Sequence, residues 1–295
     1  NKLQTNVEYA EIKHRSNDKE QQTMKQIKLR IFLLLIIFII TNSVAAAANN
    51  FDHSIWDGLL HKHVHMIRQG QASEVDYHAL LKNRNELRSY LSRLSAVAYS
   101  EFARWPQDER LAFLINAYNA YTVELILTRY PKLDSIKDLG SLFQSPWKKD
   151  FVPLLGKIRS LDDIEHGMIR KPGDYNEPRI HFTVNCASIG CPALLNEAFT
   201  GDKLEQQLET VTKAFLEDRT RNRYNASTGR LEVSKIFDWY AQDFESGWGG
   251  WHSLDMFFAH YADSLTDSEQ ARQVVMAGGV RARYLDYDWS LNDRK

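Results

Sequence analysis

The pattern of apolar and polar residues predicts a chain built mostly from helices. The most apolar helix runs from an entry at residues 105–108 to about Arg129, and its apolar side chains lie all round the axis, so we expect it at the centre of the fold. Apolar residues at helical spacing predict two more long helices, over residues 77–94 and 202–219. A further helix of similar length is predicted over residues 51–68, and shorter ones over residues 161–170, 236–244, 253–261 and 268–276.

Short strand patterns separate these helices. Hairpins are predicted over residues 151–160, with a turn at Gly156, and over residues 223–233, with a turn at 227–229. Residues 281–289 predict a last strand, and residues 180–184 alternate like a strand that leads into a turn and then a helix opening at Pro192. We therefore expect an α+β fold, a mostly helical single domain with short antiparallel strands and hairpins around a central apolar helix.

The N-terminal residues predict an exported protein. Residues 1–23 are polar and without periodicity, which indicates disordered or upstream sequence, whereas residues 24–48 combine basic residues, the apolar block 31–40 and small alanines, as in a signal peptide. The block is shorter than the roughly 20 residues of a spanning helix, which favours cleavage over an uncleaved membrane anchor. We expect a periplasmic or secreted domain over residues 49–295 that meets a membrane only through the signal segment, before cleavage.

Composition and net charge indicate which classes of binding partner to expect. The chain has a formal net charge of -1, with 43% hydrophobic and 25% charged residues, which are ordinary values for a soluble globular protein. Nucleic-acid binding needs a basic excess or patch, so we expect no nucleic acid as a partner.

The candidate chemistry centres on residues 179–194, which hold the only two cysteines, Cys186 and Cys191. A nucleophilic thiol needs a base, and the nearest histidines in the sequence are His166 and His181. On a strand, His181 would face away from Cys186, whereas His166 could fold back from the preceding helix. Glu165 is the neighbour of His166 and points roughly 100° away on a helix, so it is a doubtful orienter of the imidazole.

Several alternatives remain open from the residues alone. Cys191 would cap the helix predicted at Pro192, where the helix dipole stabilises a thiolate, so either cysteine is eligible as the nucleophile. In an oxidising compartment the two cysteines could instead form a disulfide. A zinc site of His166, His181 and both cysteines lacks the usual paired C-x₂-C spacing, and we predict no metal and no cofactor.

Two asparagines, Asn116 and Asn119, lie inside the central helix. Buried polar groups need partners, so these side chains either bond neighbouring backbone or orient a site. In the second case an asparagine would hold the imidazole of a Cys-His-Asn arrangement.

Five sequence blocks closely resemble the domain-of-unknown-function family 547 (DUF547). In chain order they are LAFLINAYNAYTVELIL, SLDDIEHGMIR, RIHFTVNCASIGCPAL, SKIFDWYAQDF and YDWSLN, and the resemblance spans residues 51–292. The family has no settled activity, and its bacterial members are mostly exported. Its I-N-x-Y-N block matches the segment with Asn116 and Asn119, and its I-E-H block ends at His166. The resemblance places the family's cysteine at Cys186, and it implies that other residues can replace Cys191 and His181. The resemblance therefore favours Cys186 as the nucleophile, with His166 as its partner.

Two hypotheses follow. In the first, the protein is a thiol-dependent hydrolase or acyl transferase for an unknown small molecule or peptide. Cys186 is the nucleophile, His166 the base, and Asn116 with Asn119 orients the base. Backbone N–H groups of the 187–190 turn hold the oxyanion. The auxiliary candidates are Glu165, His181, Ser188 and Cys191. In the second, the protein is a non-catalytic extracytoplasmic binding or scaffold module with a structural Cys186–Cys191 disulfide.

Overall fold

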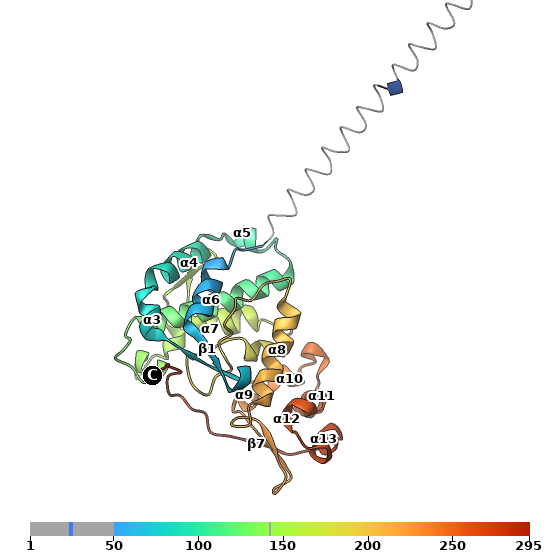
Figure 1. Ribbon diagram of the computed structural model, residues 1–295. Helices are drawn as coiled ribbons and strands as arrows, with labels where there is room; N and C mark the ends of the chain where they lie inside the picture. The colour runs from blue at the N-terminus through green and yellow to red at the C-terminus, as the bar shows by residue number, and fades with distance from the viewer. Residues whose placement is uncertain (1–23, 26–49, 142) are drawn as a thin grey trace, which may run out of the picture. The chain divides into compact units, whose positions relative to one another are not determined.

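The computed structural model describes residues 24–25, 50–141 and 143–295 (Figure 1). The predicted upstream segment, and the signal segment apart from its first two residues, lie outside these ranges. Residues 51–295 form one compact unit. Within the described ranges, every helix is too short or too polar to span a bilayer.

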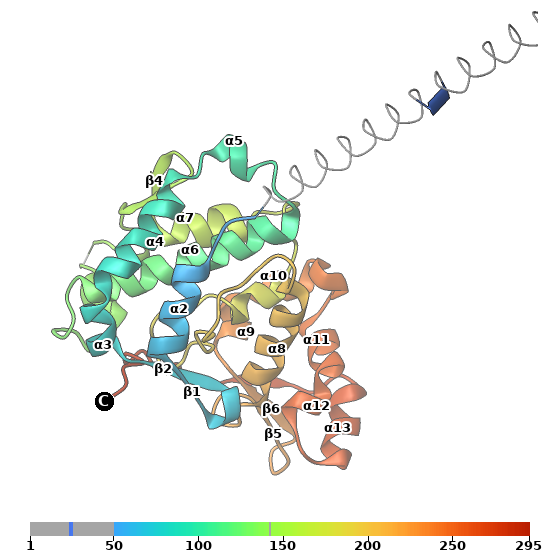
Figure 2. The ribbon, with the colours of Figure 1, turned by 45° about the horizontal axis from the view of Figure 1, so that its top comes forward.

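The helix α6 (Gln107–Leu127) is the centre of this unit, as its all-round apolar pattern predicts. All but four of its residues are buried, and the central Ala112, Ile115 and Ala120 are fully buried. On one side α4 (Arg84–Ala96) packs against it, and α2 (Ser54–His63) and α3 (Tyr77–Lys82) pack against α4 (Figure 2). The other side meets α7 (Leu161–Ile164), η4 (Glu165–Ile169) and α8 (Leu204–Glu217).

Three small sheets complete the α+β architecture. The two predicted hairpins are confirmed as β3 (Val152–Leu154) with β4 (Lys157–Arg159), and β5 (Arg223–Asn225) with β6 (Arg230–Val233). The strand β7 (Ala282–Tyr284) joins β6 in parallel. A further antiparallel pair joins β1 (Val64–Ile67) to β2 (Ala72–Val75), and β1 occupies the end of the helix predicted over residues 51–68. That prediction was wrong, because the chain turns back through left-handed backbone at Arg68, Gln69 and Gly70.

The C-terminal half adds short helices around α8. Their phenylalanines form a cluster with Phe182 and Phe215, in which ring centroids lie 4.8–6.5 Å apart. The helices are α9 (Ile236–Trp239), α10 (Ala241–Glu245), α11 (Leu254–His260), α12 (Ala262–Leu265) and α13 (Glu269–Met276). The remaining short helical turns are α5 (Tyr99–Phe102), η1 (Arg68–Gly70), η2 (Ile136–Leu139), η3 (Pro146–Lys148), η5 (Pro178–Phe182) and η6 (Trp248–Gly250).

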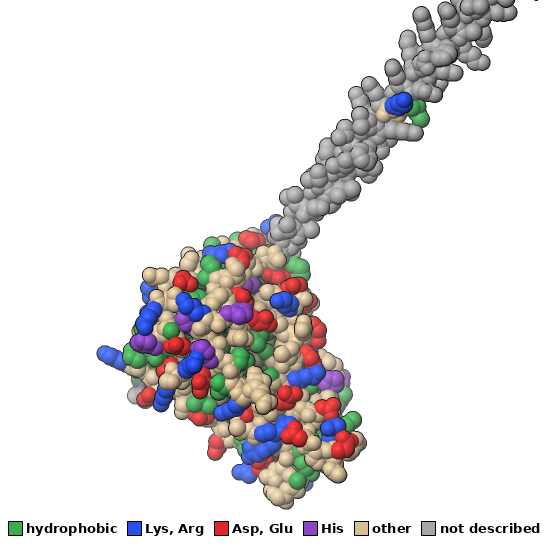
Figure 3. All heavy atoms as spheres, viewed as in Figure 1, with side chains coloured by type: hydrophobic (Ala, Val, Ile, Leu, Met, Phe, Trp, Pro, Cys, Tyr) green, Lys and Arg blue, Asp and Glu red, His purple; other side chains and the backbone are tan. Residues whose placement is uncertain are grey.

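The C-terminal arm, residues 285–295, returns from β7 to the helical half, as Figure 1 shows in dark red. Its backbone pairs with the segment around the cysteines, since the N–H groups of Ile189 and Gly190 each donate over 2.8 Å to carbonyls of the arm. Asn292 then donates to the carbonyl of Ala187 over 3.2 Å. On the face shown in Figure 3, acidic and basic side chains are interspersed.

Two predictions around the cysteines were wrong. The expected strand at residues 180–184 is the 3₁₀ turn η5, which Pro178 opens and the Glu177 side chain caps. Every residue of η5 is buried, so its apolar residues do not mark one face of a strand. The helix expected at Pro192 does not form, and side chains bind the backbone of this segment instead. The Asn185 side chain donates to the carbonyl of Pro192 over 2.7 Å. Asn116 accepts from the N–H of Phe199, and Gln207 accepts from that of Thr200.

Candidate functional site

A cleft of about 310 Å³ gathers residues from distant parts of the chain. It is bounded by α6, η3, η4, η5, the cysteine loop, α9 and the C-terminal arm. Five residues singled out from the sequence line it: Glu165, His166, His181, Cys186 and Cys191. Asn116, Asn119 and Ser188 are not part of its lining. The catalytic roles assigned to these residues from the sequence stay predictions.

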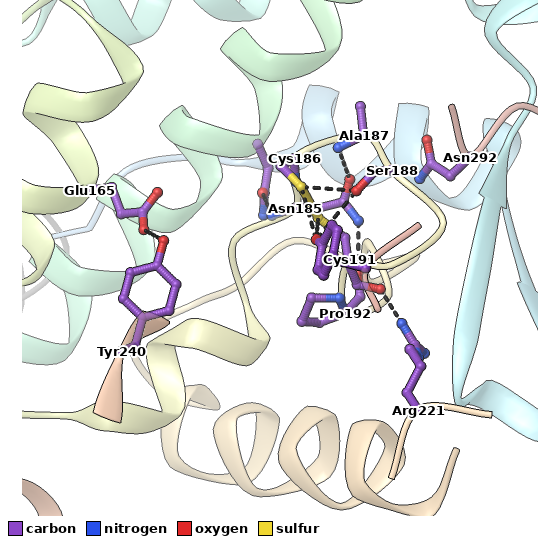
Figure 4. Close-up of a disulfide and its surroundings, with 12 residues drawn as sticks. Glu165, Asn185, Cys186, Ala187, Ser188, Cys191, Pro192, Arg221, Tyr240 and Asn292 are labelled. Atoms are coloured by element: carbon purple, nitrogen blue, oxygen red, sulfur yellow. Dashed lines mark hydrogen bonds between the residues drawn. A yellow bond between two sulfur atoms is a disulfide. The ribbon is translucent and has the colours of Figure 1, made fainter. Parts of the chain in front are cut away.

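Cys186 and Cys191 form a disulfide at this cleft (Figure 4). The Asn185 side chain spans the loop between them, since it donates to the carbonyl of Pro192 over 2.7 Å and accepts from the N–H of Ala187 over 2.8 Å. Ala187 has left-handed backbone with φ of 60°, which turns the chain sharply after the first cysteine. The guanidinium of Arg221 donates to the carbonyl of Cys191 and holds the far end of the loop.

The two asparagines of α6 bind backbone. Asn119 accepts from the N–H of Asn185 over 2.9 Å and donates to the carbonyl of Thr183 over 2.9 Å. Asn116 makes the same two-way contact with Phe199, over 3.0 and 2.7 Å. From the sequence, these side chains were expected either to bond backbone or to orient a site, and the contacts observed are with backbone. Asn119 thereby fixes the residue that precedes Cys186 to the central helix.

Hydroxyl groups surround the sulfur atoms. Cys186 Sγ lies 3.1 Å from Ser188 Oγ and 3.3 Å from the hydroxyl of Tyr287. The same hydroxyl lies 3.1 Å from Cys191 Sγ. Burial raises the pKa of Tyr287, which keeps its hydroxyl protonated and able to donate. Among the described residues, no histidine nitrogen is hydrogen-bonded to either sulfur.

The 187–190 turn offers little to an oxyanion. The N–H of Ala187 is taken by the Asn185 side chain, and those of Ile189 and Gly190 are taken by the C-terminal arm. An oxyanion donor must be unpaired and aimed at the reacting oxygen. These three N–H groups are thus already paired within the protein, and the expected role of the turn stays a prediction. The hydroxyls of Ser188 and Tyr287 are the other donors beside Cys186.

His166 has neighbours at both ring nitrogens. It lies in η4, a single π-helical turn, a feature often found at functional sites. Its Nδ1 accepts from the Arg170 guanidinium, and its Nε2 lies 3.6 Å from Asp162 Oδ1. An arginine donates only, so the Nδ1 lone pair is occupied and the ring proton sits on Nε2.

His181 has one unoccupied nitrogen. Its Nε2 lies 2.7 Å from Asp243 Oδ2, and the Tyr240 ring stacks on it at a centroid distance of 3.9 Å. Its Nδ1 is buried and without a hydrogen-bond partner. Burial lowers the pKa of His181, more than the neighbouring carboxylate raises it. The neutral ring therefore donates from Nε2 to Asp243 and has a free lone pair on Nδ1.

Asp243 holds this arrangement together. Arg170 binds it through Nε over 2.6 Å and through Nη2 over 3.0 Å. Burial of the carboxyl opposes ionisation, but hydrogen bonds from His181 and Arg170 outweigh it and lower its pKa to about 2. Arg170 thus connects the two histidines through one buried carboxylate.

Aromatic side chains form the walls of the cleft. The ring of Trp289 lies 4.5 Å from that of Tyr287, 5.6 Å from Trp239 and 5.8 Å from Trp147. Sequence reasoning selected none of these residues, nor Tyr240 and Asp243. A signal was present, because all but Trp147 belong to the blocks SKIFDWYAQDF and YDWSLN. These blocks supported the resemblance but contained no cysteine or histidine that drew attention to them.

The described ranges contain no group of three or more His, Cys, Asp or Glu side chains placed to hold a metal ion. Both cysteines of the zinc alternative are bound to each other.

Comparison with known proteins identifies one family. The model of the family described as "Protein of unknown function, DUF547" matches residues 102–216. No curated protein and no solved structure matches the chain. The matched segment includes both histidines and both cysteines of the cleft, whereas Trp239, Tyr287 and Trp289 follow it in the chain.

Proposed function

Because residues 102–216 of this chain form a domain of the DUF547 family, whose description names no activity, we propose a function from the chemistry of the cleft. The protein is a thiol-dependent hydrolase or acyl transferase that acts through Cys186 when the disulfide is reduced. The observation that carries the proposal is that one cleft holds both a cysteine sulfur and a buried neutral imidazole with a free nitrogen.

The contacts around the two histidines support His181 as the base in place of His166. His181 has a carboxylate at Nε2 and a free lone pair at Nδ1, the pattern of a base oriented by a third group. His166 already uses its Nδ1 lone pair to accept from Arg170. Asp243, which the sequence hypothesis did not include, takes the orienting role that was given to Asn116 and Asn119.

The proposed reaction begins with reduction. A dithiol reductant supplies two electrons and two protons, so that the protein disulfide becomes two thiols and the reductant becomes a disulfide. The Cys186 thiol then gives its proton to His181 Nδ1, directly or through one water, and the thiolate attacks the acyl carbonyl carbon. A C–S bond forms, and the Tyr287 hydroxyl donates to the oxyanion.

Breakdown of this intermediate completes the turnover. His181 gives the proton to the leaving group, which departs and leaves a thioester on Cys186. Water, or an acceptor alcohol or amine, then attacks the thioester and loses its proton to His181, which returns it to Cys186. In the oxidising compartment that the signal-peptide pattern predicts, the disulfide form is the resting state, so export is part of the proposal.

An aryl ester tests the proposal. We expect the full chain, reduced with a dithiol and treated with p-nitrophenyl acetate, to carry one acetyl group on Cys186 by mass spectrometry. Cys191→Ser should retain this acetylation without prior reduction, and Cys186→Ser should lose it. Equal labelling of both cysteines, or none, would overturn the proposal.

The second candidate is the non-catalytic binding or scaffold module, and the disulfide itself favours it. The disulfide closes a short loop and therefore lowers the entropy of the unfolded chain only modestly. We expect Cys186→Ser to lower the free energy of unfolding by roughly 2 kcal/mol. This candidate predicts the same loss for Cys191→Ser, and it predicts that the thiol left free in either variant is acetylated no faster than an ordinary cysteine. The acetylation of Cys191→Ser separates the two functions.

A further inference from the structure

The cleft is lined by negative charge and aromatic rings. Its lining includes the carboxyl groups of Asp162 and Glu165 but neither lysine nor arginine. Arg170 is the residue that follows η4, and its guanidinium is bound by Asp243. The imidazole of His166 lies beside Asp162, with its Nε2 3.6 Å from Asp162 Oδ1, and its Nδ1 accepts from Arg170. The cleft therefore presents acidic charge that its own lining does not neutralise.

Glu165 is a buried carboxyl group without a cationic partner. Its side chain belongs to a residue that is only 6% exposed, and no lysine, arginine or histidine nitrogen among the described residues lies within ion-pair distance of it. The Tyr240 hydroxyl donates to Glu165 Oε1 over 2.8 Å, as Figure 4 shows. Burial, followed by the charge of Glu165, raises the pKa of Tyr118 and of Tyr240, so both hydroxyls stay protonated beside it. A buried carboxylate held only by tyrosine hydroxyls gains free energy when a cation approaches.

The aromatic walls favour a particular kind of cation. Six Trp and Tyr side chains line the cleft, namely Tyr118, Trp147, Trp239, Tyr240, Tyr287 and Trp289. The faces of such rings are negative and attract organic ammonium groups, which shed water more easily than metal ions do. Lys137 and Arg170 already lie over the rings of Trp289 and Tyr240, whereas no lysine or arginine of the described residues lies over the other four. Trp239 is 44% exposed at the rim, so a ligand can reach its ring from solvent.

A hydrogen-bond acceptor lies next to this acidic group. Tyr240 connects the two, because its hydroxyl binds Glu165 while its ring stacks on His181. The free Nδ1 of His181 is buried, and the residue lines the same cleft. The acidic group and this unpartnered nitrogen therefore lie on the two sides of one tyrosine side chain.

We infer that the cleft binds organic ammonium compounds, and that its substrates are esters or amides whose leaving group carries an alkylammonium. The ammonium lies among the aromatic rings beside Glu165, and the leaving-group heteroatom meets His181. The substrate part of this inference rests on the proposed thiol chemistry. The binding part does not, because the disulfide-bonded protein already presents these groups.

Binding of choline to the oxidised full chain, followed by tryptophan fluorescence, tests the inference. We expect choline to bind at least 10-fold more tightly than its neutral isostere, in which carbon replaces the ammonium nitrogen. Glu165→Gln should reduce choline affinity at least 10-fold and leave the isostere unchanged. Trp239→Ala, a change at the exposed rim that keeps the core intact, should weaken choline binding several-fold.

The control is Glu101→Gln, which removes the same charge from an exposed residue outside the cleft lining and should leave binding unchanged. Equal affinity for choline and its isostere, or loss of choline binding in the control as well, overturns the inference. That failure is distinct from failure of the proposed function, because acetylation of Cys186 by an aryl ester requires no cation.

Discussion

Two buried histidines, His53 and His181, are held neutral by their surroundings. His53 is 5% exposed, and its Nδ1 lies 2.7 Å from the Tyr90 hydroxyl. Burial lowers its pKa from 6.5 to about 4. For His181 the same desolvation supplies the neutral imidazole that the proposed reaction needs. Burial of His53 thus affects the stability of the fold, whereas burial of His181 affects the proposed reaction.

His53 makes stability depend on pH. The unfolded chain binds a proton at this residue near pH 6.5, whereas the folded chain does so only near pH 4, so acid favours unfolding between these values. The stabilising contribution is complete above pH 6.5 and falls by about 1.4 kcal/mol per pH unit below it. We expect His53→Gln to reduce the slope of unfolding free energy against pH by that amount, measured by urea denaturation from pH 7 to pH 4. Parallel profiles for the two proteins would contradict this.

At the scale of elements, α6 is the support of the cysteine loop. Its two asparagines replace backbone partners that a strand or helix would have supplied to residues 183–199. The loop can therefore be irregular and still have its buried backbone groups paired. Asn119 binds the backbone of Asn185, next to Cys186, whereas Asn116 binds that of Phe199, further along the chain.

Asn119→Ala tests this support. It leaves a buried carbonyl at Thr183 and a buried N–H at Asn185 unpaired, so we expect the free energy of unfolding to fall by about 2–4 kcal/mol. Asn116→Ala is the matched control, with a similar loss of stability. Only Asn119→Ala should also slow acetylation of reduced Cys186 at a temperature where both variants are folded. Equal effects on acetylation would show that the contact with Asn185 does not position the cysteine.

The elements that follow from local pattern were predictable from the sequence, and those set by distant partners were not. The all-round apolar surface of α6 and the turn residues of the two hairpins act locally. The segments at residues 180–184 and 192–203 are bound by Asn119 and Asn116 of α6, which lie 64 and 83 positions from their partners Thr183 and Phe199, and no periodicity reveals such contacts. Likewise, the reactive residue types drew attention to His181 and Cys186, but the pairing of His181 with Asp243 joins residues 62 positions apart.

At the scale of the whole molecule, the cleft exists only because the C-terminal arm returns to the cysteine loop. The arm brings Tyr287 to the sulfur atoms and Trp289 to the aromatic wall, and α9 adds Trp239. The sulfur and the base therefore come from one stretch, residues 179–194, whereas the hydroxyl donor comes from the arm about 100 residues later. Such an assembly is what a preorganised site requires, since each group is held by its own packing.

The most direct test of the thiol site is the pH dependence of Cys186 alkylation by iodoacetamide in the full chain carrying Cys191→Ser. If His181 activates Cys186, the thiol titrates well below the value of about 8.5 for a free cysteine. Adding His181→Gln should return the titration to about 8.5 and slow alkylation at pH 7 about 10-fold, whereas adding His166→Gln should change neither. A Cys186 that titrates near 8.5 before His181 is replaced would contradict the account.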